Sequence, residues 1–312
     1  MPELRRDDLT GRWVLLAPGR AARPNTFAPP APDPSATEAD CPFCPGHEAL
    51  TPPEVYRTGD GAPDTPGWRV RVVPNLYPIV GGADAGPGAT GTHEVVVLSP
   101  AHGTSFAQLT EPQAVEVFTV LRDRARHHLA AGRAFVQVSI NHGRAAGASI
   151  EHPHAQLVAL DVVPPAVEHA VARVTAAGHD LVVADLEAAG ETLLVADGPV
   201  PVWCSSAPAT PYEVRLAVRA SGAHFEEVDA QIGAVALAAR DALARLAATL
   251  GDAPYNLVVL NAPPGVEPDS FHWYIEIQTR IAVPAGFEQG TGILVNTTPP
   301  ELAARQLREV ET

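Results

Sequence analysis

Two short stretches of the 312-residue chain hold side chains that could do chemistry: CPFC at 41–44 and EHPHAQ at 151–156. The C-x-x-C spacing lets both sulfurs reach one tetrahedral metal ion. A redox pair of the thioredoxin type is the alternative, but such pairs open a helix after a strand, and this one lies in a proline-rich stretch. We therefore expect Cys41 and Cys44 to bind zinc.

A zinc site of this kind needs two further ligands. His102 follows an expected strand in the turn SPAH, and His152 precedes another apolar strand. Both could therefore lie at the same end of one sheet. His47, close to the cysteines in sequence, is the local alternative.

The second stretch places an imidazole beside a carboxamide. Residues two apart in a strand face the same side, so His152, His154 and Gln156 are expected on one face. A pair of hydrogen-bonded core histidines is the alternative. A neutral imidazole whose Nδ1–H is held by a carbonyl can attack phosphorus through Nε2. Gln156 can donate a hydrogen bond to a phosphoryl oxygen but does not titrate, which favours an anionic phosphate acceptor over water.

The loop before this strand, NHGRAAGAS at 141–149, contains two glycines among small residues and ends in a hydroxyl. Small side chains let backbone N–H groups approach an anion, and such a nest requires no lysine. Together with the nearby imidazole, the loop suggests a phosphoryl group held against His154.

An internal repeat must position these residues. Residues 92–129 and 211–246 each predict a strand, a turn containing a histidine and an amphipathic helix. Two more strands follow in each half, and the 13 positions from Asn141 to His154 match those from Asn261 to Tyr274. We expect an α+β fold of two duplicated units, with helices packed on antiparallel sheets that either join or face each other. The predicted halves are 1–165 and 166–312.

Composition limits the partners. The formal net charge of −15 argues against nucleic acid as the main partner. No apolar run has the length of a membrane span and the first residues do not resemble a signal peptide, so we expect a cytoplasmic protein without a membrane partner.

Together these motifs resemble the histidine-triad superfamily, and within it the galactose-1-phosphate uridylyltransferase family, which includes plant-type ADP-glucose phosphorylases. The resemblance covers nearly the whole chain. It is carried by TGRWVLLAPGRAARP, CPFCPGHE, VPNLYP, SPAH, NHGRAAGASIEHPHAQ and GFEQGTGILVN.

The resemblance implies roles for individual residues. His154 would be the nucleophile that becomes nucleotidylated, Asn75 would contact the nucleoside, and Arg20 and Arg23 would reach the active site of a neighbouring subunit, which implies a homodimer. The groups around the phosphates would be Asn141, Gly147, Ala148, Ser149 and Gln156. A structural zinc ion would be held by Cys41, Cys44, His102 and His152.

The second half departs from the classical galactose enzymes. Leu260, Tyr274 and Glu276 stand at positions matching their second, iron-type site, so no such site is expected. Tyr274 also stands where the first repeat has His154, which implies one catalytic centre per chain. GFEQGTGILVN is closer to the plant-type phosphorylase.

The sequence therefore predicts a nucleotidyltransferase of carbohydrate metabolism, galactose metabolism in particular. It would move a nucleoside monophosphate from a UDP-hexose type of nucleotide sugar to a hexose 1-phosphate through a nucleotidyl-histidine. The alternative enzyme is a phosphorylase that splits ADP-glucose or a dinucleoside polyphosphate with inorganic phosphate. A non-catalytic nucleotide-binding protein is the alternative of another class.

Overall fold

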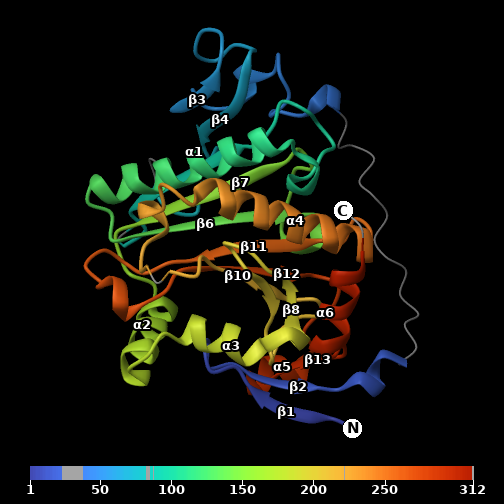
Figure 1. The fold of residues 1–312 in the computed structure, drawn as a ribbon. Coiled ribbons are helices and arrows are strands. Elements are labelled where there is room, and N and C mark those ends of the chain that lie inside the picture. The colour runs from blue at the N-terminus through green and yellow to red at the C-terminus, as the bar shows by residue number, and fades with distance from the viewer. Residues whose placement is uncertain (23–37, 82–84, 87, 221, 311–312) are drawn as a thin grey trace.

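The computed structural model describes residues 1–22, 38–81, 85–86, 88–220 and 222–310. Its main feature is one ten-stranded antiparallel sheet in the order β3-β4-β5-β7-β6-β11-β12-β10-β9-β8 (Figure 1). The strands, in this order, are Tyr56–Gly59, Trp68–Pro74, Gly91–Val97, His154–Leu160, Phe135–His142, Tyr255–Leu260, Tyr274–Thr279, Val214–Leu216, Val202–Cys204 and Leu194–Ala196.

The two expected repeats share this sheet rather than facing each other. Strand β6 of the first repeat pairs with β11 of the second, with Asn141 opposite Asn256. Each repeat contains the expected strand, helix, strand, loop and strand. The predicted α+β class with antiparallel strands is confirmed, while the boundary between 165 and 166 stays a prediction.

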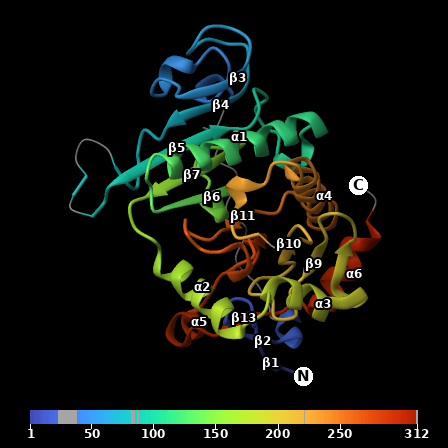
Figure 2. The ribbon, with the colours of Figure 1, turned by 60° about the vertical axis from the view of Figure 1, so that its left-hand side comes forward.

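The sheet has one apolar and one polar face in its central strands. In β7, Ala155 and Leu157 are fully buried on one side, while His154 and Gln156 alternate with them on the other. Helices α1 (Glu111–Ala130) and α4 (Ile232–Leu250) contact each other and the sheet strands (Figures 1 and 2). They bury Phe118 and Leu243, among others, so the apolar side forms the core and the polar groups of β7 are directed away from it.

A smaller sheet brings the two chain ends together. Strand β1 (Glu3–Arg6) pairs antiparallel with β2 (Trp13–Leu16), and β2 pairs parallel with β13 (Leu294–Asn296). The N-terminal hairpin therefore joins the C-terminal half, across the predicted boundary. The remaining helices are α2 (Pro165–Ala177), α3 (Leu181–Leu193), α5 (Gly286–Thr291) and α6 (Pro300–Glu309). Among the described helices, none is both long and apolar enough for a bilayer span.

Buried ion pairs attach the hairpin to the large sheet. The Arg215 guanidinium on β10 lies 2.5 Å from Asp7, 2.9 Å from Asp185 and 3.1 Å from Glu276. Arg12 lies 2.7 Å from Glu276. Burial alone would raise the pKa of Asp7, but the charge and hydrogen bonds of Arg215 hold that pKa at about 2. Because Asp7 and Glu276 are buried, water cannot replace the guanidinium groups that compensate their negative charge.

We expect Arg215→Leu to lower the free energy of unfolding by about 3–5 kcal/mol, because it leaves buried carboxylates without their partner. Arg219→Leu is the matched control: Arg219 pairs with Asp197 and both side chains are more than half exposed, so its loss should cost less than about 1 kcal/mol. Urea unfolding followed by circular dichroism measures both. Equal losses would contradict this account of the hairpin attachment.

Candidate active site

Two cysteines and two histidines converge at one end of the first repeat. Cys41 and Cys44 lie in the turn after the 3₁₀ helix Glu38–Asp40, His102 follows β5, and His152 precedes β7. Their ligand atoms all lie within 4.8 Å of one another. Cys41 Sγ is 3.6 Å and Cys44 Sγ 3.5 Å from His152 Nδ1, and Cys44 Sγ is 3.4 Å from His102 Nδ1.

These separations fit a tetrahedral ion. Sulfur at about 2.3 Å and nitrogen at about 2.0 Å from a tetrahedral centre lie about 3.5 Å apart. His152 Nε2 is 2.7 Å from the carbonyl oxygen of Ser99, so its N–H donates there and Nδ1 is left to the metal. Burial lowers the pKa of His152 to about 4, which keeps the ring neutral. The cluster could therefore hold a metal ion.

His47, the alternative ligand, lies outside this cluster. Its Nδ1 is 2.8 Å from the carbonyl oxygen of Cys41, so its N–H supports the cysteine turn through the backbone. The four ligands taken from the resemblance are thus the ones that the structure brings together.

His154 is the first residue of β7 and is buried. Its Nδ1 lies 2.9 Å from the carbonyl oxygen of His152, so the Nδ1–H donates there and Nε2 keeps its lone pair. Burial also lowers the pKa of His154, which favours the neutral ring. The Phe43 ring lies 5.5 Å from the His154 ring between centroids. The Cys/His cluster therefore lies next to the candidate nucleophile, and Phe43 and His152 connect the two.

One expectation about this strand was wrong. His152 does not share a strand face with His154, because β7 begins only at His154. Pro153 has no N–H to contribute to the ladder, so the chain reaches His154 as a loop. The His152 side chain therefore points toward the cysteines. Of the three residues, His154 and Gln156 share a face of β7.

Asn141 lies beside His154 at the end of β6, and both line one small cavity with Ala148. The Asn141 Oδ1 accepts a 2.7 Å hydrogen bond from Asn256 Nδ2, which also donates to the carbonyl oxygen of Ala146 at 2.8 Å. Arg280 donates to Asn256 Oδ1. Asn256 therefore fixes the carboxamide of Asn141 and ties the loop at 143–149 to the second repeat.

Three N–H groups of the loop are bonded within it and are not available for the backbone nest expected from its composition. The N–H groups of Ala146 and Ala148 donate to Gly143 and that of Gly147 donates to Arg144, at 3.0–3.3 Å. Gly147 has φ +89°, a conformation that suits glycine. Ser149 is exposed. In this conformation, side chains such as Asn141 and Gln156 are the more available anion donors.

Gln156 and Asn75 meet at a histidine that the sequence motifs did not single out. His93 Nε2 is 3.1 Å from Gln156 Oε1 and 3.2 Å from Asn75 Nδ2. His93 and Asn256 share a signal that could have found them: each is a polar residue next to the apolar run of a strand, and each is buried.

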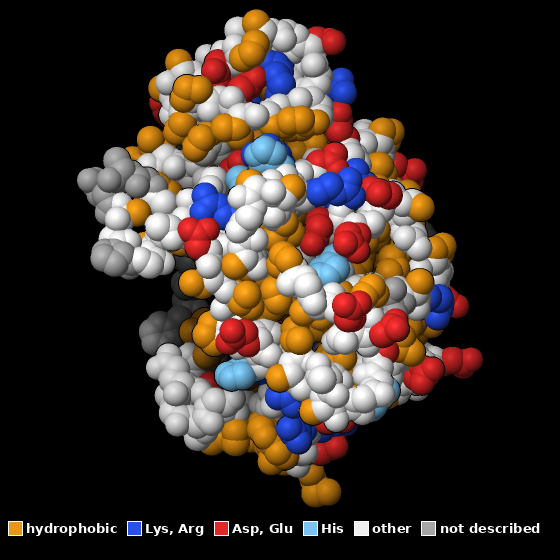
Figure 3. Space-filling view, turned by 90° about the vertical axis from the view of Figure 1, so that its left-hand side faces the viewer, with side chains coloured by type: hydrophobic (Ala, Val, Ile, Leu, Met, Phe, Trp, Pro, Cys, Tyr) orange, Lys and Arg blue, Asp and Glu red, His pale blue; other side chains and the backbone are white. Residues whose placement is uncertain are grey.

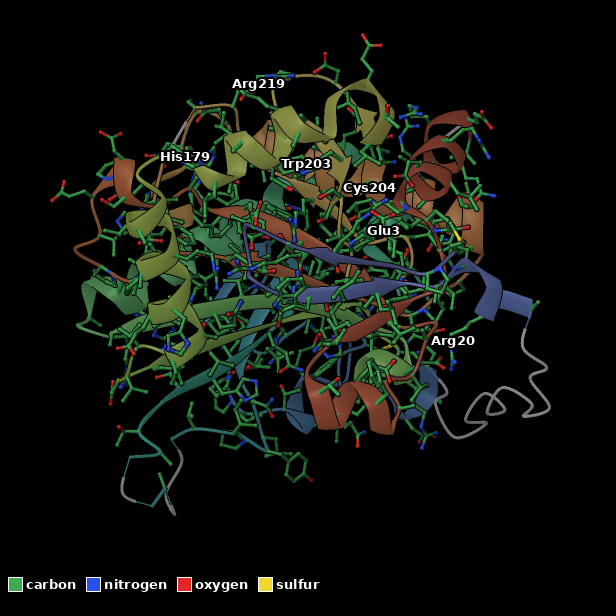
Figure 4. All side chains as sticks on the ribbon, turned by 90° about the horizontal axis from the view of Figure 1, so that it is seen from below. Glu3, Arg20, His179, Trp203, Cys204 and Arg219 are labelled. Atoms are coloured by element: carbon green, nitrogen blue, oxygen red, sulfur yellow. The ribbon has the colours of Figure 1, made fainter. Side chains whose placement is uncertain are left out.

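Arg20 does not line the cavity beside His154. Arg20 is exposed on the 3₁₀ turn Pro18–Ala22 (Figure 4), and Arg23 lies outside the described residues. Figure 3 shows one face with hydrophobic side chains among scattered acidic and basic groups, without a continuous basic area.

Known proteins are similar to this chain along its whole length. Galactose-1-phosphate uridylyltransferase of Thermotoga maritima is 27% identical over 100% of this chain and 99% of its own. A family described as a domain of unknown function, DUF4921, matches residues 101–312. ADP-glucose phosphorylase of Arabidopsis thaliana is 31% identical over 99% of this chain and 93% of its own. The chain belongs to the galactose-1-phosphate uridylyltransferase-like family.

A solved structure agrees with this membership. The crystal structure of an Arabidopsis thaliana ADP-glucose phosphorylase with bound ADP-glucose matches this uridylyltransferase-like chain with a TM-score of 0.87 and 28% identity, over 100% of both chains. The protein is thus an enzyme of the nucleotidyltransferase type.

Proposed function

We propose that His154 carries a nucleotidyl group from a nucleotide sugar to a second phosphate. In the first step, Nε2 attacks the α-phosphorus, the N–P bond forms and the P–O bond to sugar 1-phosphate breaks. In the second step, an oxygen of the acceptor phosphate attacks the same phosphorus and the N–P bond breaks. The observation that carries this proposal is the His154 Nδ1–H bonded to the carbonyl oxygen of His152.

The residues around this ring fit phosphate chemistry without proton transfer. A sugar 1-phosphate leaves as an anion, so it needs no proton from the site, and an anionic acceptor needs no base. Gln156 can neither give nor take a proton, but its amide can donate to a phosphoryl oxygen. Asn141 can do the same, and such donors stabilise the charge that builds on the transferring group.

For the substrates, we propose a UDP-hexose type of nucleotide sugar as donor and a hexose 1-phosphate as acceptor. The whole-length similarity to the Thermotoga maritima uridylyltransferase supports this pair. Asn75 would contact the nucleoside, and the groups around the phosphates would be Asn141, Gly147, Ala148, Ser149 and Gln156.

A second candidate is phosphorolysis of ADP-glucose, with inorganic phosphate as acceptor. It is favoured by the 31% identity to the plant phosphorylase and by the segment GFEQGTGILVN at 286–296, which is closer to the plant-type phosphorylase than to the classical galactose enzymes.

The metal is proposed to be zinc in a structural role. Two thiolates and two imidazoles are typical zinc ligands, and all four positions are filled by protein. Bound zinc would hold the Cys41–Cys44 turn against His102 and His152. We also propose a cytoplasmic homodimer, in which Arg20 and Arg23 would reach the partner's site.

We expect wild-type protein incubated with α-³²P-labelled UDP-glucose or ADP-glucose to retain label after acid-free denaturation, since the group is bonded to nitrogen. His154→Asn should lower labelling by more than about a thousandfold, because the nucleophile is gone. His179→Asn is the control, since His179 is exposed on a loop after α2. Release of sugar 1-phosphate by wild type without labelled protein would reject the two-step route.

Loss of one cysteine ligand should remove the metal. We expect Cys41→Ser to lower bound zinc from about one ion per chain toward zero and Tm by more than about 5 °C, because metal binding and folding are coupled. Cys204→Ser is the matched control, since Cys204 is also buried but does not belong to the cluster. Elemental analysis and thermal unfolding measure both effects. Unchanged zinc in Cys41→Ser would remove the assignment.

A further inference from the structure

His93 lies between Asn75 and Gln156, the two side chains proposed to contact the nucleotide. It is not itself proposed to contact the substrate. It belongs to β5 and is 5% exposed. Strand β5 pairs with β7, where Val95 lies opposite Gln156. His93 is therefore held inside the sheet, next to the displayed carboxamide.

The hydrogen bonds of the ring determine which nitrogen carries the proton. The backbone N–H of Ile79 donates to His93 Nδ1 at 3.2 Å, so Nδ1 must keep its lone pair. Burial lowers the pKa of His93, which favours the neutral ring. A neutral ring with a bare Nδ1 carries its proton on Nε2.

This tautomer determines the orientation of Gln156. His93 Nε2–H faces Gln156 Oε1 at 3.1 Å, an arrangement in which the ring donates and the carbonyl oxygen accepts. The Gln156 NH2 group is then directed away from His93. Within the described part of the chain, that NH2 has no hydrogen-bond partner, so it is available to a ligand. The reverse orientation would turn an acceptor oxygen toward an anionic phosphate.

We propose that His93 is a positioning residue of the transfer site: its Nε2–H holds Gln156 Oε1, so that the Gln156 NH2 faces the phosphoryl group carried by His154. The proposal rests on the function proposed above. Asn75 lies beside this ring, with its Nδ2 3.2 Å from the same ring nitrogen. With the proton on Nε2, both groups are donors, so this contact is not a hydrogen bond. Asn75 is held instead by the N–H of Tyr77, which donates to its Oδ1.

Two substitutions separate the hydrogen bond from the packing. In His93→Asn, Oδ1 can replace Nδ1 as the acceptor for Ile79, but no donor reaches Gln156. In His93→Gln, the longer side chain places an amide donor near the position of Nε2. The single-turnover rate of protein labelling by α-³²P-UDP-glucose or ADP-glucose should fall about ten- to a hundredfold in His93→Asn and recover at least in part in His93→Gln.

A double-mutant cycle tests whether the effect passes through Gln156. If it does, His93→Asn should slow labelling in the wild-type background but change it less than about twofold in a Gln156→Leu background. His128→Phe is the control for loss of a buried histidine: His128 pairs with Glu94 at 3.0 Å, so this variant should lose stability and keep the labelling rate.

The outcomes distinguish this proposal from the proposed function. If wild-type protein acquires no label, the nucleotidyl-histidine route fails and the role of His93 with it. If wild type is labelled but His93→Asn reacts as fast, or slows equally with and without Gln156, the positioning role alone is overturned. Should His93→Asn not fold, the cycle is run with His93→Phe, which keeps a ring at this position but has no donor for Gln156. This variant must show coupling to Gln156, and additive effects would reject the proposal.

Discussion

The hydrogen bond from His154 Nδ1–H to the carbonyl oxygen of His152 is the constraint on which the site depends. It leaves Nε2 as the one ring nitrogen with a free lone pair. The side chain of His152, which supplies this carbonyl, belongs to the Cys/His cluster that could hold a metal ion. The Cys/His cluster therefore holds the His152 carbonyl in place, and this carbonyl orients the imidazole of His154. The candidate nucleophile is thus oriented by the fold before any substrate binds.

The two repeats share one sheet but put the corresponding positions to different uses. In the first repeat, His154 borders a small cavity, and the NH2 group of Gln156 is left available to a ligand. In the second, Tyr274 is buried and Glu276 is bound by Arg12 and Arg215. The same strand positions thus contribute to the candidate active site in one half and to buried ion pairs with the N-terminal hairpin in the other.

Sequence patterns could predict features that depend on local spacing or on repetition. The alternation in β7, the C-x-x-C turn and the 13-residue interval after Asn141 are such features, and the α+β fold follows from them. The pairing of β6 with β11 could not be predicted, because the sequence of the last strand in each repeat's own sheet does not show which other strand it will pair with. The attachment of the N-terminal hairpin to the large sheet depends on charges more than 200 positions apart, as in Arg215 and Asp7.

The hydrogen-bond network of the site was the least predictable part. His93 and Asn256 each bind a carboxamide on a neighbouring strand: His93 contacts Gln156 Oε1, and Asn256 donates to Asn141 Oδ1. Sequence patterns do not show such atom-specific contacts. Composition also could not show that the N–H groups of Ala146, Gly147 and Ala148 donate within their own loop. A Gly/Ala-rich loop can direct such groups at a ligand or at its own carbonyls, and its composition is the same in both cases.

The tautomer of His154 tests the central claim most directly. In protein carrying ¹⁵N-labelled histidine, NMR at neutral pH should show His154 with a proton on Nδ1 and none on Nε2. After addition of a nucleotide sugar, coupling to ³¹P should appear at Nε2. A proton on Nε2 in the resting protein, or phosphorus coupled to Nδ1, would contradict the account.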